Sequence, residues 1–160
     1  MSRRWVYDDG GRAAAGFKGS TGDCVTRAIA IATEKPYAEV YESINELARV
    51  TERGRNSGRS SARTGVWKET YRLYLRAQGW NFTPLVTIGS GCKVHLRASE
   101  LPKGRIICRL SKHLSAVIDG VVHDTFDPSR AGTRCVYGYF SKTRDGWAHR
   151  VPQIFGEGGQ

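Results

Sequence analysis

The chain has 160 residues, which is enough for one domain with its own core and too short for two domains of ordinary size. Its formal net charge of +10 favours anionic partners, such as nucleic acid or acidic protein surfaces, but does not by itself define a function. The longest purely apolar run, "AIAIA", is far too short to cross a membrane, so we expect no membrane partner.

The first 19 residues are rich in glycine and arginine and contain the turn signal "DDGGR". This composition predicts an arm with little regular structure, laid over the domain. No apolar segment follows Met1, so we expect no secretory signal peptide and a cytoplasmic location. In a reducing compartment, the four scattered cysteines favour free thiols, a metal site or catalysis over disulfides.

Apolar residues at helical spacing predict a short, mostly buried helix over residues 24–33, with Thr21 or Asp23 as its N-cap. Cys24 is the first residue of this helix, where unpaired N–H groups and the helix dipole favour a thiolate, the nucleophilic form of the side chain. A lone cysteine is also a common small core residue. A general base elsewhere in the chain must decide between these two interpretations.

Two further helices are expected before the pattern changes. Pro36 precedes an amphipathic helix, and a third helix extends over residues 64–78 and ends at Gly79. Between them, residues 53–63 contain four arginines and no acidic residue, which is typical of a mobile basic loop.

After the third helix, the hydrophobic pattern alternates, which indicates strands. The candidate segments are "WNFTPLVTI", "KVHL", "GRIICRL", "HLSAVID", "VVHDTF" and "RCVYGYF". Helices followed by strands predict an α+β domain over residues 20–150, with N-terminal helices packed on a C-terminal antiparallel sheet. Residues 151–160 are expected to form a flexible tail.

The segment "HLSAVIDGVVHD", residues 113–124, contains an Asp-Gly pair between two alternating apolar runs, a strong signal for a two-residue hairpin turn. The resulting register places Ser115 opposite Asp124 and His113 opposite Phe126, with all four side chains on one face. Asp124 then lies diagonally from His113 and can orient its imidazole. A histidine held in this way is the general base of a Cys-His-Asp triad.

A cysteine that begins the first core helix, followed by helices and then by a histidine that begins one strand of a hairpin, resembles the papain-like cysteine peptidase superfamily. The resemblance spans most of residues 20–140, and "GDC" with "HLSAVIDGVVHD" is similar to the compact NlpC-type cell-wall peptidases. It implies a papain-like fold and a cysteine peptidase or amidase that acts through a thioester, with Cys24 as nucleophile, His113 as base and Asp124 as the orienting acid. No cofactor and no metal are expected. The substrate would be a protein or peptide, for which the charge favours an anionic one, and peptide, isopeptide and muropeptide bonds all stay open.

The fragment "DTFDP" resembles the bacteriocin-leader peptidases of the same superfamily, in which an Asp-Pro pair supplies the acid of the triad. That resemblance favours Asp127. We prefer Asp124, because it follows from the hairpin register without a bulge, and we interpret Asp127 before Pro128 as a turn residue.

The chain departs from papain at the oxyanion hole, because papain's glutamine, six residues before the cysteine, is replaced by a lysine. The backbone N–H of Cys24 can supply one donor. The candidates for the second donor are Lys18, Ser20, Thr21 and Tyr7.

Two other interpretations use the same residues. "CKVH" has the spacing of metal ligands, so Cys92, His95, Cys108 and His113 could form a zinc site, although such a site would leave Cys24 unexplained. Alternatively, the chain is a nucleic-acid or protein binding module on a catalytically inactive papain-like fold. In that case the basic loop would act together with three aromatic residues, Trp67, Tyr71 and Tyr74. These aromatic residues recur at helical spacing, which favours core packing instead.

Overall fold

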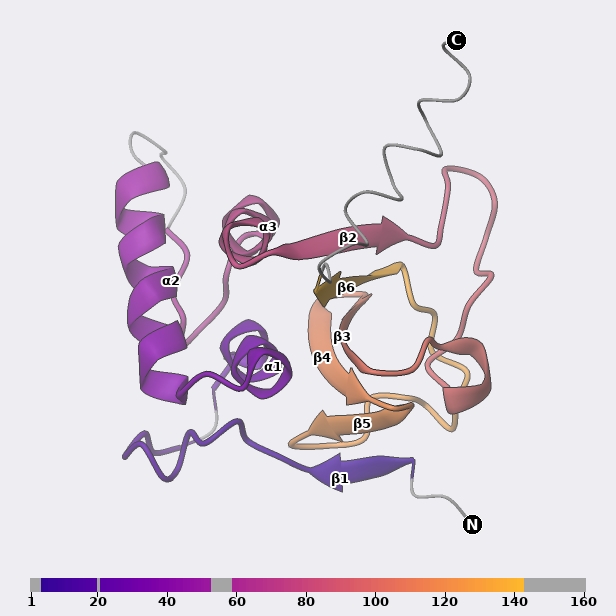
Figure 1. Ribbon diagram of the computed structural model, residues 1–160, viewed down its shortest axis with the longest axis horizontal. Helices are drawn as coiled ribbons and strands as arrows, with labels where there is room; N and C mark the ends of the chain where they lie inside the picture. The colour runs from indigo at the N-terminus through magenta and orange to yellow at the C-terminus, as the bar shows by residue number, and fades with distance from the viewer. Residues whose placement is uncertain (1–3, 20, 53–58, 143–160) are drawn as a thin grey trace, which may run out of the picture.

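The computed structural model describes residues 4–19, 21–52 and 59–142. The structure has three α-helices and a single sheet. The α-helices lie together on one side of the sheet (Figure 1). The predicted α+β class is therefore confirmed. The predicted flexible tail over residues 151–160 and most of the predicted basic loop lie outside the described residues.

The helices are α1 (Cys24–Thr33), α2 (Tyr37–Thr51) and α3 (Lys68–Ala77). The bounds of α1 match the prediction, and eight of its ten residues are buried because it lies between α2 and the sheet. Helix α3 begins four residues later than predicted, because Ser61 and Gly65 pair across a turn that occupies the intervening chain. Gly79, with a φ of 84°, ends α3 as expected.

The sheet has six strands in the order β1-β5-β4-β3-β6-β2. The central hairpin pairs β4 (His113–Ile118) with β5 (Val121–Asp124). Beyond β4 follow β3 (Arg105–Leu110), β6 (Gly138–Lys142) and the edge strand β2 (Trp80–Pro84), all joined antiparallel as predicted.

The first strand, β1 (Trp5–Tyr7), corrects the prediction that the N-terminal arm has little regular structure. It pairs in parallel with β5 and covers the edge that the hairpin would otherwise expose. Trp5 Nε1 and the backbone N–H of Asp8 both donate to the main-chain oxygen of Asp124, across 3.2 and 2.9 Å. Since parallel pairing joins distant segments, no local pattern in the sequence predicts it.

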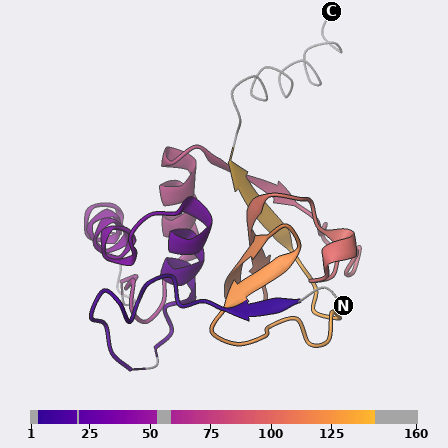
Figure 2. The ribbon, with the colours of Figure 1, turned by 60° about the horizontal axis from the view of Figure 1, so that its bottom comes forward.

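Figure 2 shows the helices on one side of the sheet and the segment before β3 on the other. An apolar cluster lies on each face. One lies between the sheet and the helices and includes Ile29, Leu75 and Phe140. The other packs beneath the segment that contains a short 3-10 helix, η1 (Ala98–Glu100), and includes Leu96. Because α1 packs directly on β4, the beginning of α1 lies beside the beginning of β4.

The expectation that the cysteines form no disulfide is wrong, because Cys92 and Cys135 are bonded, with their Cα atoms 5.8 Å apart. The predicted "KVHL" strand is also absent, and this segment makes only an isolated bridge between His95 and Cys135. A stable disulfide is typical of oxidising compartments and weighs against the cytoplasmic location, which stays a prediction. Among the described helices, none has the length and apolar character needed to cross a bilayer.

Candidate active site

The hairpin between β4 and β5 turns as the sequence predicts. Asp119 and Gly120 both have positive φ values, 49° and 81°, as the favoured two-residue hairpin turn requires. Ile118 therefore pairs with Val121, and the predicted register is confirmed along the paired strands.

The polar side chains of this hairpin converge on one carboxylate. His113 Nε2 lies 2.7 Å from Oδ2 of Asp124, and the hydroxyl of Ser115 donates to the same oxygen across 2.7 Å. The other oxygen, Oδ1, accepts the backbone N–H of Thr125 at 2.7 Å. The ring of Phe126 packs on the His113 ring, with centroids 5.2 Å apart. The four side chains that the register assigns to one face therefore do meet.

The carboxyl of Asp124 is held in its charged form. Burial alone would raise its pKa, but the hydrogen bonds from His113 and Ser115 bring the pKa below its ordinary value. Asp127, in contrast, is exposed and accepts the backbone N–H of Ser129 at 3.0 Å, as a turn residue does. The structure thus brings Asp124, and not Asp127, to the imidazole.

The thiol of Cys24 completes the group. Burial would raise its pKa, but a hydrogen bond and the charge of His113 lower the pKa below that of a free cysteine. Burial would also lower the pKa of His113, yet the hydrogen bonds with Asp124 and Cys24 raise it to about 9. Because Nε2 of His113 is engaged by Asp124, Nδ1 is the nitrogen left for Cys24. The opposite shifts favour the charged pair of a thiolate beside an imidazolium.

The N-terminus of α1 has no side-chain cap, which differs from the prediction. Asp23 occupies the capping position, but its carboxylate instead accepts the hydroxyl of Tyr37 at 2.6 Å and the guanidinium groups of Arg12 and Arg27. The first N–H groups of α1 are therefore left without a side-chain acceptor, in the position where an anion is favoured.

Arg27 is a buried residue of this site that the sequence analysis missed. One of its nitrogens contacts Asp23, and Nη2 lies 3.2 Å from Oδ1 of Asp124. It follows Cys24 by three positions and so connects the helix that carries the thiol to the strand that carries the acid. The available signal was an arginine within the otherwise apolar stretch "CVTRAIAIA".

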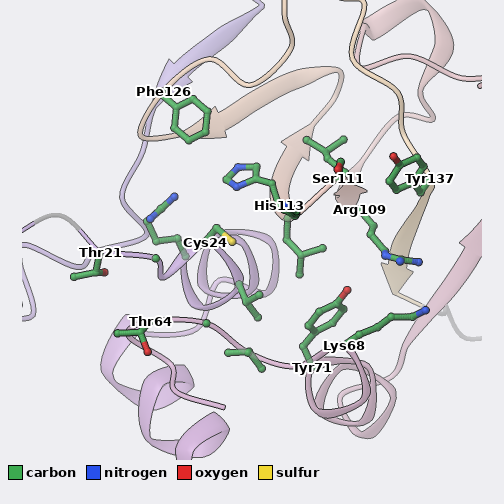
Figure 3. Close-up of a pocket in the computed structure, with 18 residues that line it drawn as sticks. Thr21, Cys24, Thr64, Lys68, Tyr71, Arg109, Ser111, His113, Phe126 and Tyr137 are labelled. Atoms are coloured by element: carbon green, nitrogen blue, oxygen red, sulfur yellow. The ribbon is translucent and has the colours of Figure 1, made fainter. Parts of the chain in front are cut away.

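Cys24 and His113 lie in an open cleft of about 730 Å³. Figure 3 shows them at its centre, between Thr21 and Thr64 on one side and Lys68, Arg109 and Tyr137 on the other. The walls come from the start of α1, residues 64–66, α3 and the turn between β3 and β4. Because lining residues lie on both sides of Cys24, the cleft offers contacts to a substrate on either side of the thiol.

The candidates for the second oxyanion donor differ in whether they line the cleft. Thr21 lines the cleft, whereas Lys18 and the largely exposed Tyr7 are not among its lining residues. Ser20 lies outside the described residues. Thr21 is therefore the only candidate among the described residues that reaches the cleft.

The alternative zinc site is not assembled. Cys92 is consumed by its disulfide, and Cys108 is fully buried within β3. Over residues 4–19, 21–52 and 59–142, no group of three or more His, Cys, Asp or Glu side chains is arranged so that it could hold a metal ion.

The aromatic residues proposed for nucleic-acid stacking are placed differently. Tyr71 and Tyr74 are 6% and 5% exposed and belong to the core under the helices. Two of the three aromatics are thus used mainly for packing, as their helical spacing indicated.

Comparisons of the chain with protein-family models, with curated proteins and with solved structures gave no significant match.

Proposed function

We propose that this protein is a cysteine hydrolase on a papain-like fold, a peptidase or amidase that cleaves a peptide, isopeptide or related amide bond. The observation that carries the proposal is the position of His113, which lies 2.7 Å from the Asp124 carboxylate and lines the same cleft as Cys24. The opposite pKa shifts of Cys24 and His113 support it, because a lone core cysteine has neither a partner base nor a lowered pKa.

In the proposed reaction, the Cys24 thiolate attacks the amide carbonyl and forms a tetrahedral intermediate. Protonated His113 then gives its proton to the leaving amine, and a thioester to Cys24 remains. Water, deprotonated by neutral His113, attacks the thioester and releases the acid and the thiol. Asp124 keeps the imidazole in orientation and stabilises its cationic form.

The negative oxygen of the tetrahedral intermediate needs hydrogen-bond donors. The backbone N–H of Cys24 belongs to the uncapped first turn of α1 and is suited to this role. Thr21 lines the cleft, and its hydroxyl is buried with no hydrogen-bond partner among the described residues, so Thr21 is a candidate for the second donor.

The test is the rate at which iodoacetamide alkylates Cys24 near pH 7, followed by a peptide screen. His113→Ala should slow the alkylation about tenfold or more, because the thiol returns toward its ordinary pKa. His123→Gln is the matched control, since His123 lies on the same hairpin but pairs with Asp8. An equal rate in His113→Ala and the wild type would contradict the proposal and favour a binding module on an inactive fold.

A further inference from the structure

The cleft does not end at the proposed triad. Beyond Tyr71 it opens into a second pocket of about 470 Å³, which shares Lys68, Arg109 and Tyr137 with the cleft. The second pocket adds Arg72 to this wall. In Figure 3, Lys68 and Arg109 extend toward each other on the Tyr137 side of Cys24.

This end of the cleft carries positive charge without compensation. Lys68, Arg72 and Arg109 line it, and Lys112 adds a fourth cation on the cleft wall. No acidic residue is among the described residues that line it. Within the described part of the chain, none of the four makes an ion pair. Cations that converge without a counter-charge repel one another, and an anionic group bound between them would relieve that repulsion.

Two of the cations are held in place by aromatic rings. The guanidinium of Arg109 lies 5.9 Å from the ring centroid of Tyr137, and that of Arg72 lies 5.3 Å from the ring centroid of Phe82. The backbone of Arg109 is fixed as well, since its carbonyl accepts the N–H of Tyr137 at 2.9 Å. A guanidinium packed by its face keeps its N–H edge free for two parallel bonds to a carboxylate.

We propose that the wall formed by Lys68, Arg72 and Arg109 is a specificity subsite that binds an acidic side chain, aspartate or glutamate, of a peptide substrate on one side of the scissile bond. This inference rests on the proposed function, because it assumes that the chain in the cleft presents its carbonyl to Cys24. A peptide carboxylate is favoured over a nucleic-acid phosphate because two of these cations, Lys68 and Arg109, line the same cleft as Cys24.

The test uses tripeptide acyloxymethyl ketones, which alkylate an active-site thiol. Each probe carries glutamate or its neutral isostere glutamine at the first, second or third residue from the ketone. At one position, the glutamate probe should label Cys24 about tenfold faster than the glutamine probe, since a charge-assisted bond is lost in glutamine. Arg109→Gln and Arg72→Gln should each reduce this ratio, and the double variant should bring it close to one.

Lys103→Gln is the matched control, because it removes one exposed cation that does not line the cleft or the second pocket. In this variant, the ratio of the labelling rate of the glutamate probe to that of the glutamine probe should equal the wild-type ratio. Circular dichroism of each variant checks that the fold is kept. Arg72→Gln, at a half-buried position of α3, tests the subsite independently if Arg109→Gln unfolds.

Three outcomes would overturn the inference, and they differ from one another. Equal labelling rates for the glutamate and glutamine probes at all three positions would contradict the proposed subsite, but not the proposed cysteine hydrolase. Equal ratios in the wild type and the double variant, with loss of binding to a single-stranded oligonucleotide in the double variant, would assign the wall to nucleic acid. If no probe labels Cys24, and if the rate of its alkylation by iodoacetamide does not depend on His113, both proposals are contradicted.

Discussion

Nη2 of Arg27 lies 3.2 Å from Oδ1 of Asp124, so the helix that begins with the thiol and the strand that ends with the acid are joined by a buried ion pair. The same guanidinium contacts Asp23, at the N-terminus of α1. Side-chain exposure is 6% for Arg27 and 3% or less for both carboxylates. Arg27 thus pairs with two buried carboxylates, one at the N-terminus of the helix that carries Cys24 and one at the end of β5.

Arg27→Met should lower the free energy of unfolding by about 3 kcal/mol, because it leaves two buried carboxylates with one partner fewer. Urea unfolding followed by circular dichroism measures this loss. Arg105→Met is the control, since the ion pair of Arg105 with Glu34 is partly exposed and should be worth about 1 kcal/mol or less. Equal losses in the two variants would show that the Arg27 network does not stabilise the fold.

The pH dependence of hydrolysis should follow the ionisation of Cys24 and His113. Activity requires the Cys24 thiolate and protonated His113, so it should rise at a pH below the ordinary thiol range and fall as His113 loses its proton at about pH 9. Asp124→Asn removes a negative charge that stabilises the imidazolium, so the pKa of His113 should fall and the alkaline limb should move to lower pH. The measurement is kcat/KM across pH 5 to 10 for wild type and variant. An alkaline limb that stays in place would mean that Asp124 does not control this proton.

The two candidate acids predict opposite results for their variants. Asp124→Asn should lower kcat by about 10²-fold or more, because the imidazole loses its orienting charge. Asp127→Asn should leave kcat unchanged, since an asparagine oxygen can still accept the N–H of Ser129. Steady-state kinetics of both variants check the assignment, and the reverse ranking would assign the role of the acid to Asp127.

The parts of the site that lie close together in the sequence could be predicted from it. The Asp-Gly turn fixes the pairing of β4 with β5, and an alternating strand then places Ser115 and Asp124 on the face of His113. The contacts of Arg27 could not be predicted, because its two partners are 4 and 97 positions away and an arginine in a helix is usually exposed. The parallel pairing of β1 and the disulfide also join distant segments and leave no periodic signal.

The cysteines give a prediction that depends on the disulfide, which the sequence analysis did not anticipate. Without reduction, the folded protein should take up one iodoacetamide, at Cys24, because Cys108 is fully buried and burial raises its pKa to about 12. Unfolding without reduction should add a second label, at Cys108, and reduction should add two more. Intact mass spectrometry counts the labels, and two labels on the unreduced folded protein would contradict either the burial of Cys108 or the pairing of Cys92 with Cys135.

The same disulfide should contribute to stability by closing a long loop. It joins positions 43 residues apart, so its loss restores chain entropy to the unfolded state. The double variant Cys92→Ala and Cys135→Ala should unfold with a free energy about 2–4 kcal/mol lower than that of the oxidised wild type. Urea unfolding of wild type with and without a reductant is the matched comparison. The reductant should lower the free energy of unfolding of the wild type toward that of the double variant, and it should leave the free energy of unfolding of the double variant unchanged. Equal stability of the oxidised wild type and the double variant would show that the bond between Cys92 and Cys135 does not constrain the chain.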